Sequence, residues 1–211
     1  MTRKIIPFLF LLALCSCAAK QISVPPIDTA EPAGTMQVPG KYAILVQSGQ
    51  WNAKESTRDA PLGAFGALGH GCAPYHFKFD VDSAFQDAAK KSLTSVLASI
   101  DFIEAPLTSE QVFERGYEAQ IVVREGSLRI NHDVFGFVIN AKAYVDICLE
   151  FIDRKGDYRT IAPATGASTR NFYATCDTVG DVAVEAVQDG LRKAAHSSAL
   201  AIRNRLKPAN P

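Results

Sequence analysis

The sequence predicts an α+β domain: a two-layer sandwich in the order β-α-β-β-β-α, with two helices on one face of a mostly antiparallel sheet. Two patterns indicate this fold. Apolar residues recur at helical spacing in residues 81–100 and again in residues 182–206. Between these stretches the period becomes two, most clearly in residues 141–152, where the odd positions are apolar and the charged residues fall on even positions. Such elements bury their apolar surfaces by packing against each other.

The first seventeen residues have the parts of a bacterial export signal. Arg3 and Lys4 precede the apolar run 5–14, which is too short to cross a bilayer as a permanent helix. The run leads into Leu14-Cys15-Ser16-Cys17. Leucine, any residue, a small residue and cysteine, in this order, resembles the lipobox of bacterial lipoproteins. In that family the signal is cut before the cysteine, which is then acylated on its sulfur and on its new amino group.

The resemblance implies a signal peptide over residues 1–16 and attachment of fatty acyl chains, such as palmitate, to Cys17. Cys15 fits the pattern less well, because it would place the bulky Leu14 at the small position. The alternative is an ordinary secreted protein that is cut at Ser16 or Ala18.

The segment after the signal reads as a linker. Residues 18–39 contain four prolines among small and polar residues and show no periodicity. This composition predicts a lipidated tether over residues 17–40, followed by a single domain over residues 41–207. About 22 such residues would have a root-mean-square reach of roughly 25–30 Å if flexible.

The charge balance restricts the partners. The 211-residue chain carries 22 basic and 22 acidic residues, and loss of Arg3 and Lys4 with the signal leaves a net charge of −2. This balance argues against a nucleic-acid partner, which would require a broad positive field. No second apolar segment approaches the ~20 residues of a membrane-spanning helix, so we expect the protein to attach to the membrane through its acyl chains.

Within the domain, the apolar run 42–46 predicts a buried first strand, and the long irregular stretch 48–80 follows it. Ser83 and Gln86 indicate a capping box at the start of the first helix, which the apolar stripe extends to Ile100. A connecting segment then leads to the sheet, and its residues 108–114 could form a helical turn.

Gly126 lies where the apolar phase of residues 118–131 changes. Two interpretations compete there: a bulge within one long strand, or a tight hairpin turn at Gly126. We prefer the bulge, because it gives three long strands of matched length, joined by turns near Asp133 and Lys155. Pro163 lacks a backbone donor, which predicts that the third of these strands lies at a sheet edge.

Removal of Cys15 and acylation of Cys17 would leave three thiols in the mature chain. In the predicted topology both helices begin at the same end of the domain, and Cys72 and Cys176 precede one helix each. We therefore expect a Cys72–Cys176 disulfide, which fits an oxidising compartment, whereas the hairpin interpretation would separate the pair. Closing a loop of about a hundred residues would stabilise the fold by roughly 4–5 kcal/mol. Cys148 lies on the polar phase of its strand and is expected to be a half-exposed structural thiol.

His70, Cys72 and His76 lie within seven residues and could form a metal or thiol site. Their spacing matches no standard structural site, however, and a disulfide flanked by two solvated histidines explains the same residues. The glycines of residues 63–71 neither follow a strand directly nor open a helix, so they do not form a dinucleotide-binding fingerprint. We expect no metal and no cofactor, and the lack of a recognisable catalytic arrangement favours a protein without enzymatic activity.

Two apolar stretches could bind a partner: the Gly/Ala-rich patch 61–69 and residues 134–139 beside a predicted turn. The candidate partner-binding residues are Leu62, Phe65, Leu68, Phe135 and Phe137. The alternative is that each stretch folds back over one end of the core.

The order of elements over residues 41–206 is similar to that of small outer-membrane lipoproteins that face the periplasm, such as the lipopolysaccharide-assembly lipoprotein LptE and the YajG-like proteins. This resemblance, together with Ala18 rather than aspartate after Cys17, implies the outer membrane as the location. We expect a non-enzymatic accessory or docking subunit of an envelope assembly, transport or secretion complex, with another envelope protein as partner and its own oligomeric state left open. Two alternatives are a module that binds an acyl or glycan group and a metal or thiol enzyme using His70, Cys72 and His76.

Overall fold

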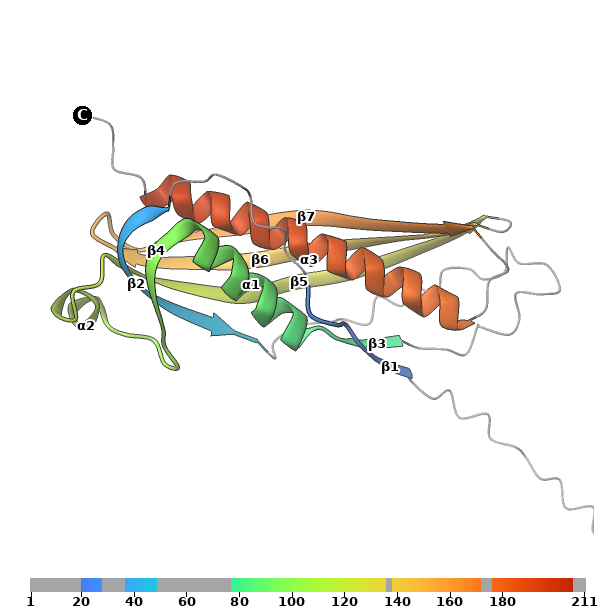
Figure 1. Ribbon diagram of the computed structural model, residues 1–211, viewed down its shortest axis with the longest axis horizontal. Coiled ribbons are helices and arrows are strands. Elements are labelled where there is room, and N and C mark those ends of the chain that lie inside the picture. The colour runs from blue at the N-terminus through green and yellow to red at the C-terminus, as the bar shows by residue number, and fades with distance from the viewer. Residues whose placement is uncertain (1–19, 28–36, 49–76, 136–137, 172–175, 207–211) are drawn as a thin grey trace, which may run out of the picture.

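The computed structural model describes residues 20–27, 37–48, 77–135, 138–171 and 176–206 (Figure 1). These residues form a five-stranded sheet, covered on one face by two helices, and a separate two-stranded sheet. The predicted two-layer α+β fold with a mostly antiparallel sheet is confirmed. In chain order the elements are β1 (Lys20–Ser23), β2 (Val38–Gln47), β3 (Phe77–Asp80), α1 (Asp82–Val96), β4 (Leu97–Phe102), α2 (Ser109–Glu114), β5 (Ala119–Phe135), β6 (Val138–Asp153), β7 (Tyr158–Asn171) and α3 (Cys176–Leu206).

The large sheet has the strand order β4-β2-β5-β6-β7. β2 runs parallel to both of its neighbours, and β5, β6 and β7 form an antiparallel meander. The three meander strands contain 17, 16 and 14 residues, so their matched length is confirmed. The edge position predicted from Pro163 is confirmed as well, because β7 pairs only with β6 in the described part of the chain.

The bulge in β5 is also confirmed. The pairing of β5 with β6 shifts in register between Glu125 and Leu128, and the strand continues through the shift to Phe135. A Cβ atom on Gly126 would lie 2.6 Å from the backbone oxygen of Asp146, so glycine is required where the bulged strand approaches its neighbour. β5 continues two residues past Asp133, to Phe135, and the turn between β6 and β7 lies at Lys155, as predicted.

The core lies between the sheet and the pair α1 and α3. Side chains of β6 alternate as predicted: the odd positions from Ile139 to Asp153 are buried, and the even positions are partly or fully exposed. α3 contributes a stripe of small and branched side chains that faces β6 and β7, and α1 packs beside it. The stripe consists of Val182, Ala183, Ala186, Val187, Leu191, Ala194, Ala195, Ala199 and Ile202.

The first helix differs from its prediction at both ends. α1 ends at Val96, and the residues assigned to its last turn form β4, where Leu97 pairs with Val38 of β2. Leu97 and Ile100 have helical spacing, but pairing with β2 overrides this local signal. The predicted Ser83 capping box is wrong, because the N-cap residue is Val81 and makes no side-chain cap bond. A complete capping box occurs instead where Thr108 opens α2, at the helical turn considered possible from the sequence.

The predicted tether also requires correction, because residues 20–27 belong to the fold. β1 pairs in parallel with β3, and Val24 and Ile27 are buried in the main core. The prolines of this segment suggested a flexible linker, but an extended chain that docks on a domain tolerates proline equally well. β2 begins at Val38, so the domain starts well before residue 41.

Candidate functional surfaces

Most of the site residues predicted from the sequence lie outside the described part of the chain. These are Cys17, Leu62, Phe65, Leu68, His70, Cys72, His76 and Phe137. The backbone of Phe135 ends β5 and that of Cys176 begins α3, but their side chains are also outside the description. The lipidation, the Cys72–Cys176 disulfide and the two apolar binding stretches therefore remain predictions. Within the described ranges, no three His, Cys, Asp or Glu side chains form a group that could hold a metal ion.

One face of β5, β6 and β7 points away from α1 and α3, and we call it the open face. Its first feature is an ion cluster in which Glu150 lies between two guanidinium groups. One carboxylate oxygen of Glu150 is 2.7 Å from Arg159 of β7, and the other is 3.2 Å from Arg124 of β5. The cluster thus ties three neighbouring strands together across their polar side.

Further along the same face, the charges are more exposed. The guanidinium carbon of Arg129 lies 5.7 Å from the ring centre of Tyr144, its direct partner on β6. Arg129 and Lys142 are both exposed, and Ser127 donates a hydrogen bond to Asp146 beside them. This part of the open face therefore presents two cations around a half-buried aromatic ring.

Cys148 lies between these two regions and is a free thiol. Burial raises its pKa, and the nearby carboxylates of Asp146 and Glu150 raise it further. A thiol that stays protonated at neutral pH is a poor nucleophile. The geometry agrees with the interpretation of Cys148 as a half-exposed structural residue. Its cross-strand neighbour Ile161 is the most exposed of the large apolar side chains in the described ranges, at 59%.

The α2 end of the open face is covered. Gln120 is 1% exposed, and its side-chain oxygen accepts a hydrogen bond of 2.6 Å from the backbone N–H of Leu107. Val112 and Tyr117 pack with Ala43 into a small second core on this side of the sheet. This cover was difficult to predict from the sequence, because α2 is only six residues long. Ile152, an apolar residue on the otherwise polar phase of β6, packs against this second core and was an available signal.

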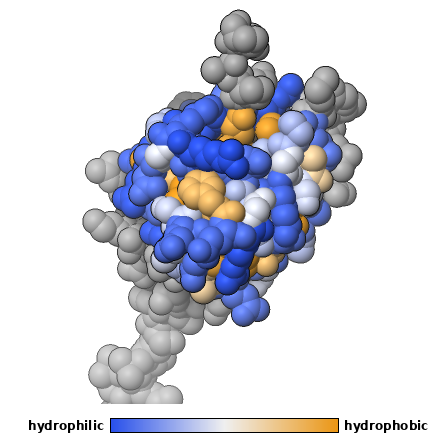
Figure 2. Space-filling view, turned by 90° about the vertical axis from the view of Figure 1, so that its left-hand side faces the viewer, coloured by the Kyte–Doolittle hydropathy of each residue, from blue (hydrophilic) through white to orange (hydrophobic). Residues whose placement is uncertain are grey.

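A polar triad lies near this cover. Asp101 is 2.7 Å from the amine of Lys41 and accepts a hydrogen bond of 2.8 Å from the hydroxyl of Tyr117. Hydrogen bonds from Lys41 and then from Tyr117 lower the pKa of Asp101. Figure 2 views the molecule from the α2 end and shows a mostly hydrophilic surface with a few separate apolar residues. The described surface at this end thus carries no broad apolar patch.

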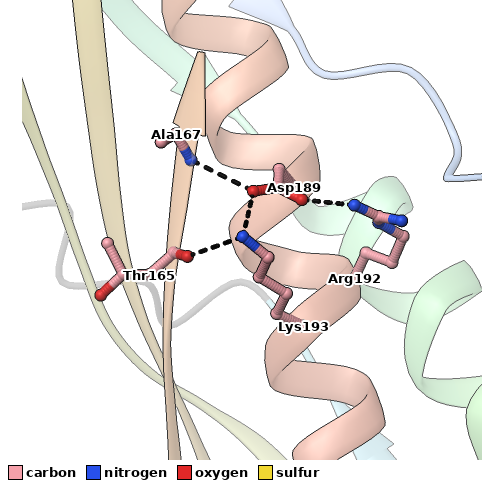
Figure 3. A network of polar contacts seen from close by, with 5 residues as sticks. All are labelled: Thr165, Ala167, Asp189, Arg192 and Lys193. Carbon is pink, nitrogen blue, oxygen red and sulfur yellow. Dashed lines mark hydrogen bonds and ion pairs between the residues drawn. The ribbon is translucent and has the colours of Figure 1, made fainter.

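Side chains of α3 bond to backbone groups on the outer edge of β7 (Figure 3). Asp189 accepts a hydrogen bond of 3.2 Å from the backbone N–H of Ala167 on β7, and Lys193 donates one of 3.3 Å to the carbonyl of Thr165. Lys193 and Arg192 also form ion pairs with Asp189. The backbone N–H of Ala167 and the backbone carbonyl of Thr165 thus point away from β6. Pro163 lies two residues before Thr165, so its backbone faces the same outer side, and the N–H that proline lacks removes no hydrogen bond between β6 and β7.

The far end of α3 is fixed to the hairpin between β6 and β7. Arg205 donates two hydrogen bonds to the buried carboxylate of Asp153, at 2.8 and 3.0 Å, and a third to the carbonyl of Gly156. The same guanidinium lies 4.8 Å from the ring centre of Tyr158. Basic residues in the last turn of a helix generally complement its dipole. The two-pronged pair with Asp153 shows a more specific role in positioning α3.

Comparison with known proteins places this architecture beside several solved structures. No protein-family model matches the chain, and no curated protein matches it by sequence. A minor lipoprotein from Acinetobacter baumannii is 14% identical, with a TM-score of 0.42 over 83% of this chain and 100% of that one. A hypothetical protein from Chlamydia trachomatis is 9% identical, with a TM-score of 0.45 over 79% and 97%. A PelC variant from Paraburkholderia phytofirmans, crystallised as a dodecamer, is 16% identical, with a TM-score of 0.32 over 80% and 93%. At these values the similarities assign no function and no site residue to this chain.

The described part of the chain contains three helices, α1, α2 and α3. None of them is both long and apolar enough to cross a bilayer.

Proposed function

We propose that this chain is a lipid-anchored protein of the bacterial envelope that acts without catalysis, as a docking or accessory subunit of an assembly, transport or secretion complex. The observation that carries the proposal is the lipobox Leu14–Cys17, which ends three residues before the first strand of the domain. Ala18 after the acylated cysteine supports the outer membrane as its location, with the domain facing the periplasm.

The open face is the surface best suited to a protein partner. Neither α1 nor α3 covers it, and it combines the exposed cations Arg129 and Lys142 with the half-buried ring of Tyr144. Arginine and aromatic side chains are enriched at protein interfaces, where charged groups also set the orientation of binding. The apolar residues Phe135 and Phe137, at the end of β5 and between β5 and β6 in the sequence, are a second docking surface in this proposal.

The experiment is a crosslinking pull-down of the acylated protein from its own membranes, preceded by intact-mass measurement. We expect a mass that includes acyl groups on Cys17, and one partner in stoichiometric amount. The double variant Arg129→Glu with Lys142→Glu should lose the partner if the open face binds it. Phe135→Asp should lose the partner if the surface of Phe135 and Phe137 binds it. His196→Glu, on the exposed side of α3, is the matched control. An unacylated amino terminus would overturn the anchor, and no loss of partner in either variant would overturn these docking surfaces.

A second candidate function is the binding of a glycan on the open face. The observation that favours it is the placement of Arg129 and Lys142 beside Tyr144, since an aromatic ring flanked by hydrogen-bond donors suits a polar ligand better than an acyl chain. Native mass spectrometry of the protein with envelope extract tests this candidate. A bound species that Tyr144→Ala abolishes would support it. The metal or thiol enzyme is tested by metal analysis, and a metal-free protein with an oxidised Cys72 would exclude it.

A further inference from the structure

We propose that the domain lies directly against the bilayer, with the end that carries β1 and β3 toward the lipid and the α2 end away from it. The inference rests on the proposed lipidation of Cys17, and it adds an orientation and a membrane-facing end to that function. It follows from how firmly residues 20–27 are built into the domain and how little chain separates them from the anchor.

The backbone of this segment is fixed by a strand pairing. Residues 20–23 of β1 pair with residues 77–80 of β3, and the N–H of Val24 donates a hydrogen bond of 2.8 Å to the carbonyl of Asp80. β3 leads directly into α1, so the pairing attaches β1 to one of the two core helices.

The side chains bury the segment further. Val24 is 1% exposed and Ile27 is 4% exposed, and both belong to the main hydrophobic core. Lys91 of α1 donates a hydrogen bond of 3.0 Å to the carbonyl of Ile27, and Gln188 of α3 donates one of 3.2 Å to the carbonyl of Pro25. Because both helices hold residues 24–27, the segment cannot leave the domain without exposing core side chains.

The remaining connection is short. Only residues 18 and 19 lie between Cys17 and the first residue of β1, so the chain from Cys17 to Lys20 spans at most about 11 Å. A free tether of 22 residues would instead reach roughly 25–30 Å. β1 lies at the end of the molecule away from α2 (Figure 1). An acylated Cys17 at the bilayer surface therefore holds the β1 end close to the lipid and leaves the open face accessible from the side.

The test measures energy transfer from a donor in the full-length acylated protein to acceptor-labelled lipid headgroups in vesicles. The donor is a fluorescent non-natural amino acid, placed either at Ser23 of β1 or at Glu114 of α2, both of which are exposed. We expect transfer from Ser23 to be several times more efficient than transfer from Glu114. A flexible insert of about 20 residues between Ala19 and Lys20, long enough to restore a free tether, should bring the two values together. The same insert after Pro211 is the matched control and should change neither value.

Equal transfer from the two positions in the parent protein, or an unchanged difference with the insert after Ala19, would overturn the orientation. Failure of the proposed function has a different signature: the intact mass would lack acyl groups and the protein would not float with the vesicles. In that event a histidine tag in place of residues 1–17, bound to nickel-chelating lipids, holds the chain at the same point. The transfer difference between Ser23 and Glu114 then tests the orientation without the natural anchor.

Discussion

Gly166 of β7 is the position where the packing of α3 on the sheet can be tested most sharply. A Cβ atom there would lie 2.0 Å from the carbonyl oxygen of Ala186 and 2.1 Å from the backbone nitrogen of Gly190. Both are backbone atoms of α3, so no side-chain rotation can relieve the clash. Since Cβ atoms keep at least 3.0 Å from such neighbours, Gly166→Ala requires α3 to move away by about 1 Å.

The magnitude follows from that displacement. A gap of 0.5–1 Å forfeits roughly a quarter to a half of the dispersion attraction at each contact, and α3 is the main cover of β6 and β7. Overpacked core substitutions cost about 1–3 kcal/mol and occasionally more, and the rigid contact at Gly166 belongs at the upper end. We expect Gly166→Ala to lower the free energy of unfolding by about 3 kcal/mol, and the melting temperature by roughly 6–12 °C for a domain of this size.

Urea and thermal unfolding followed by circular dichroism measure this effect. Thr165→Ala is the matched control, because its side chain lies on the open face and its backbone bond to Lys193 is kept, so it should change stability by no more than about 0.5 kcal/mol. Gly190→Ala should be milder than Gly166→Ala. Its Cβ would meet a methyl group of Val145 at 2.8 Å but would stay 3.3 Å or more from the nearest backbone atoms, and alanine favours the helix by about 1 kcal/mol. If Gly166→Ala were as stable as the control, the close contact of α3 with β7 would be refuted.

Three other substitutions or measurements address the polar contacts. Arg205→Ala leaves the buried carboxylate of Asp153 without its guanidinium, which should destabilise the domain by about 2–3 kcal/mol in urea unfolding, and Arg205→Lys should recover only part of this loss. At Asp189, burial alone would raise the pKa, but hydrogen bonds from Lys193, Arg192 and Ala167 outweigh it and lower the pKa. The ionised group therefore adds stability above the ordinary carboxyl pKa of about 4, and this contribution is lost as the pH falls through the lowered value. Asp189→Asn should thus be less stable than the parent at pH 7, with a difference that shrinks in acid; a constant difference would contradict the assignment. Cys148 in the folded protein should react with iodoacetamide slowly at pH 7, as read by peptide mass spectrometry, and rapidly once the protein is unfolded in urea.

The central part of the fold could be predicted because its signals are local and periodic. The alternation of apolar and polar residues along β6 is typical of a sheet with one solvent-exposed face. The change of apolar phase at Gly126, together with the matched strand lengths, identified the bulge in β5. Pro163 indicated the edge strand through its missing donor alone. In each case one residue or one period carries the constraint.

The remaining features depend on pairings between distant segments. β1 and β3 are four residues each and are separated by more than fifty residues, so neither shows a readable period of its own. β4 has apolar spacing that fits a helix, and only its pairing with β2 decides its conformation. The open face could be anticipated as a polar surface, but the Arg129–Tyr144 contact required the register of β5 against β6. The covering of Gln120 by residues near α2 likewise depends on tertiary packing.

The side-chain bonds to the outer edge of β7 would have a consequence for copies that share a membrane through the proposed lipid anchor. Molecules confined to two dimensions meet often, and an unprotected strand border would let one sheet extend into the next. Here a neighbour approaching Thr165 and Ala167 would find a carboxylate and an ammonium group already bonded to the backbone, rather than open donors and acceptors. The outer edge of β7 therefore disfavours edge-to-edge pairing of sheets from neighbouring molecules.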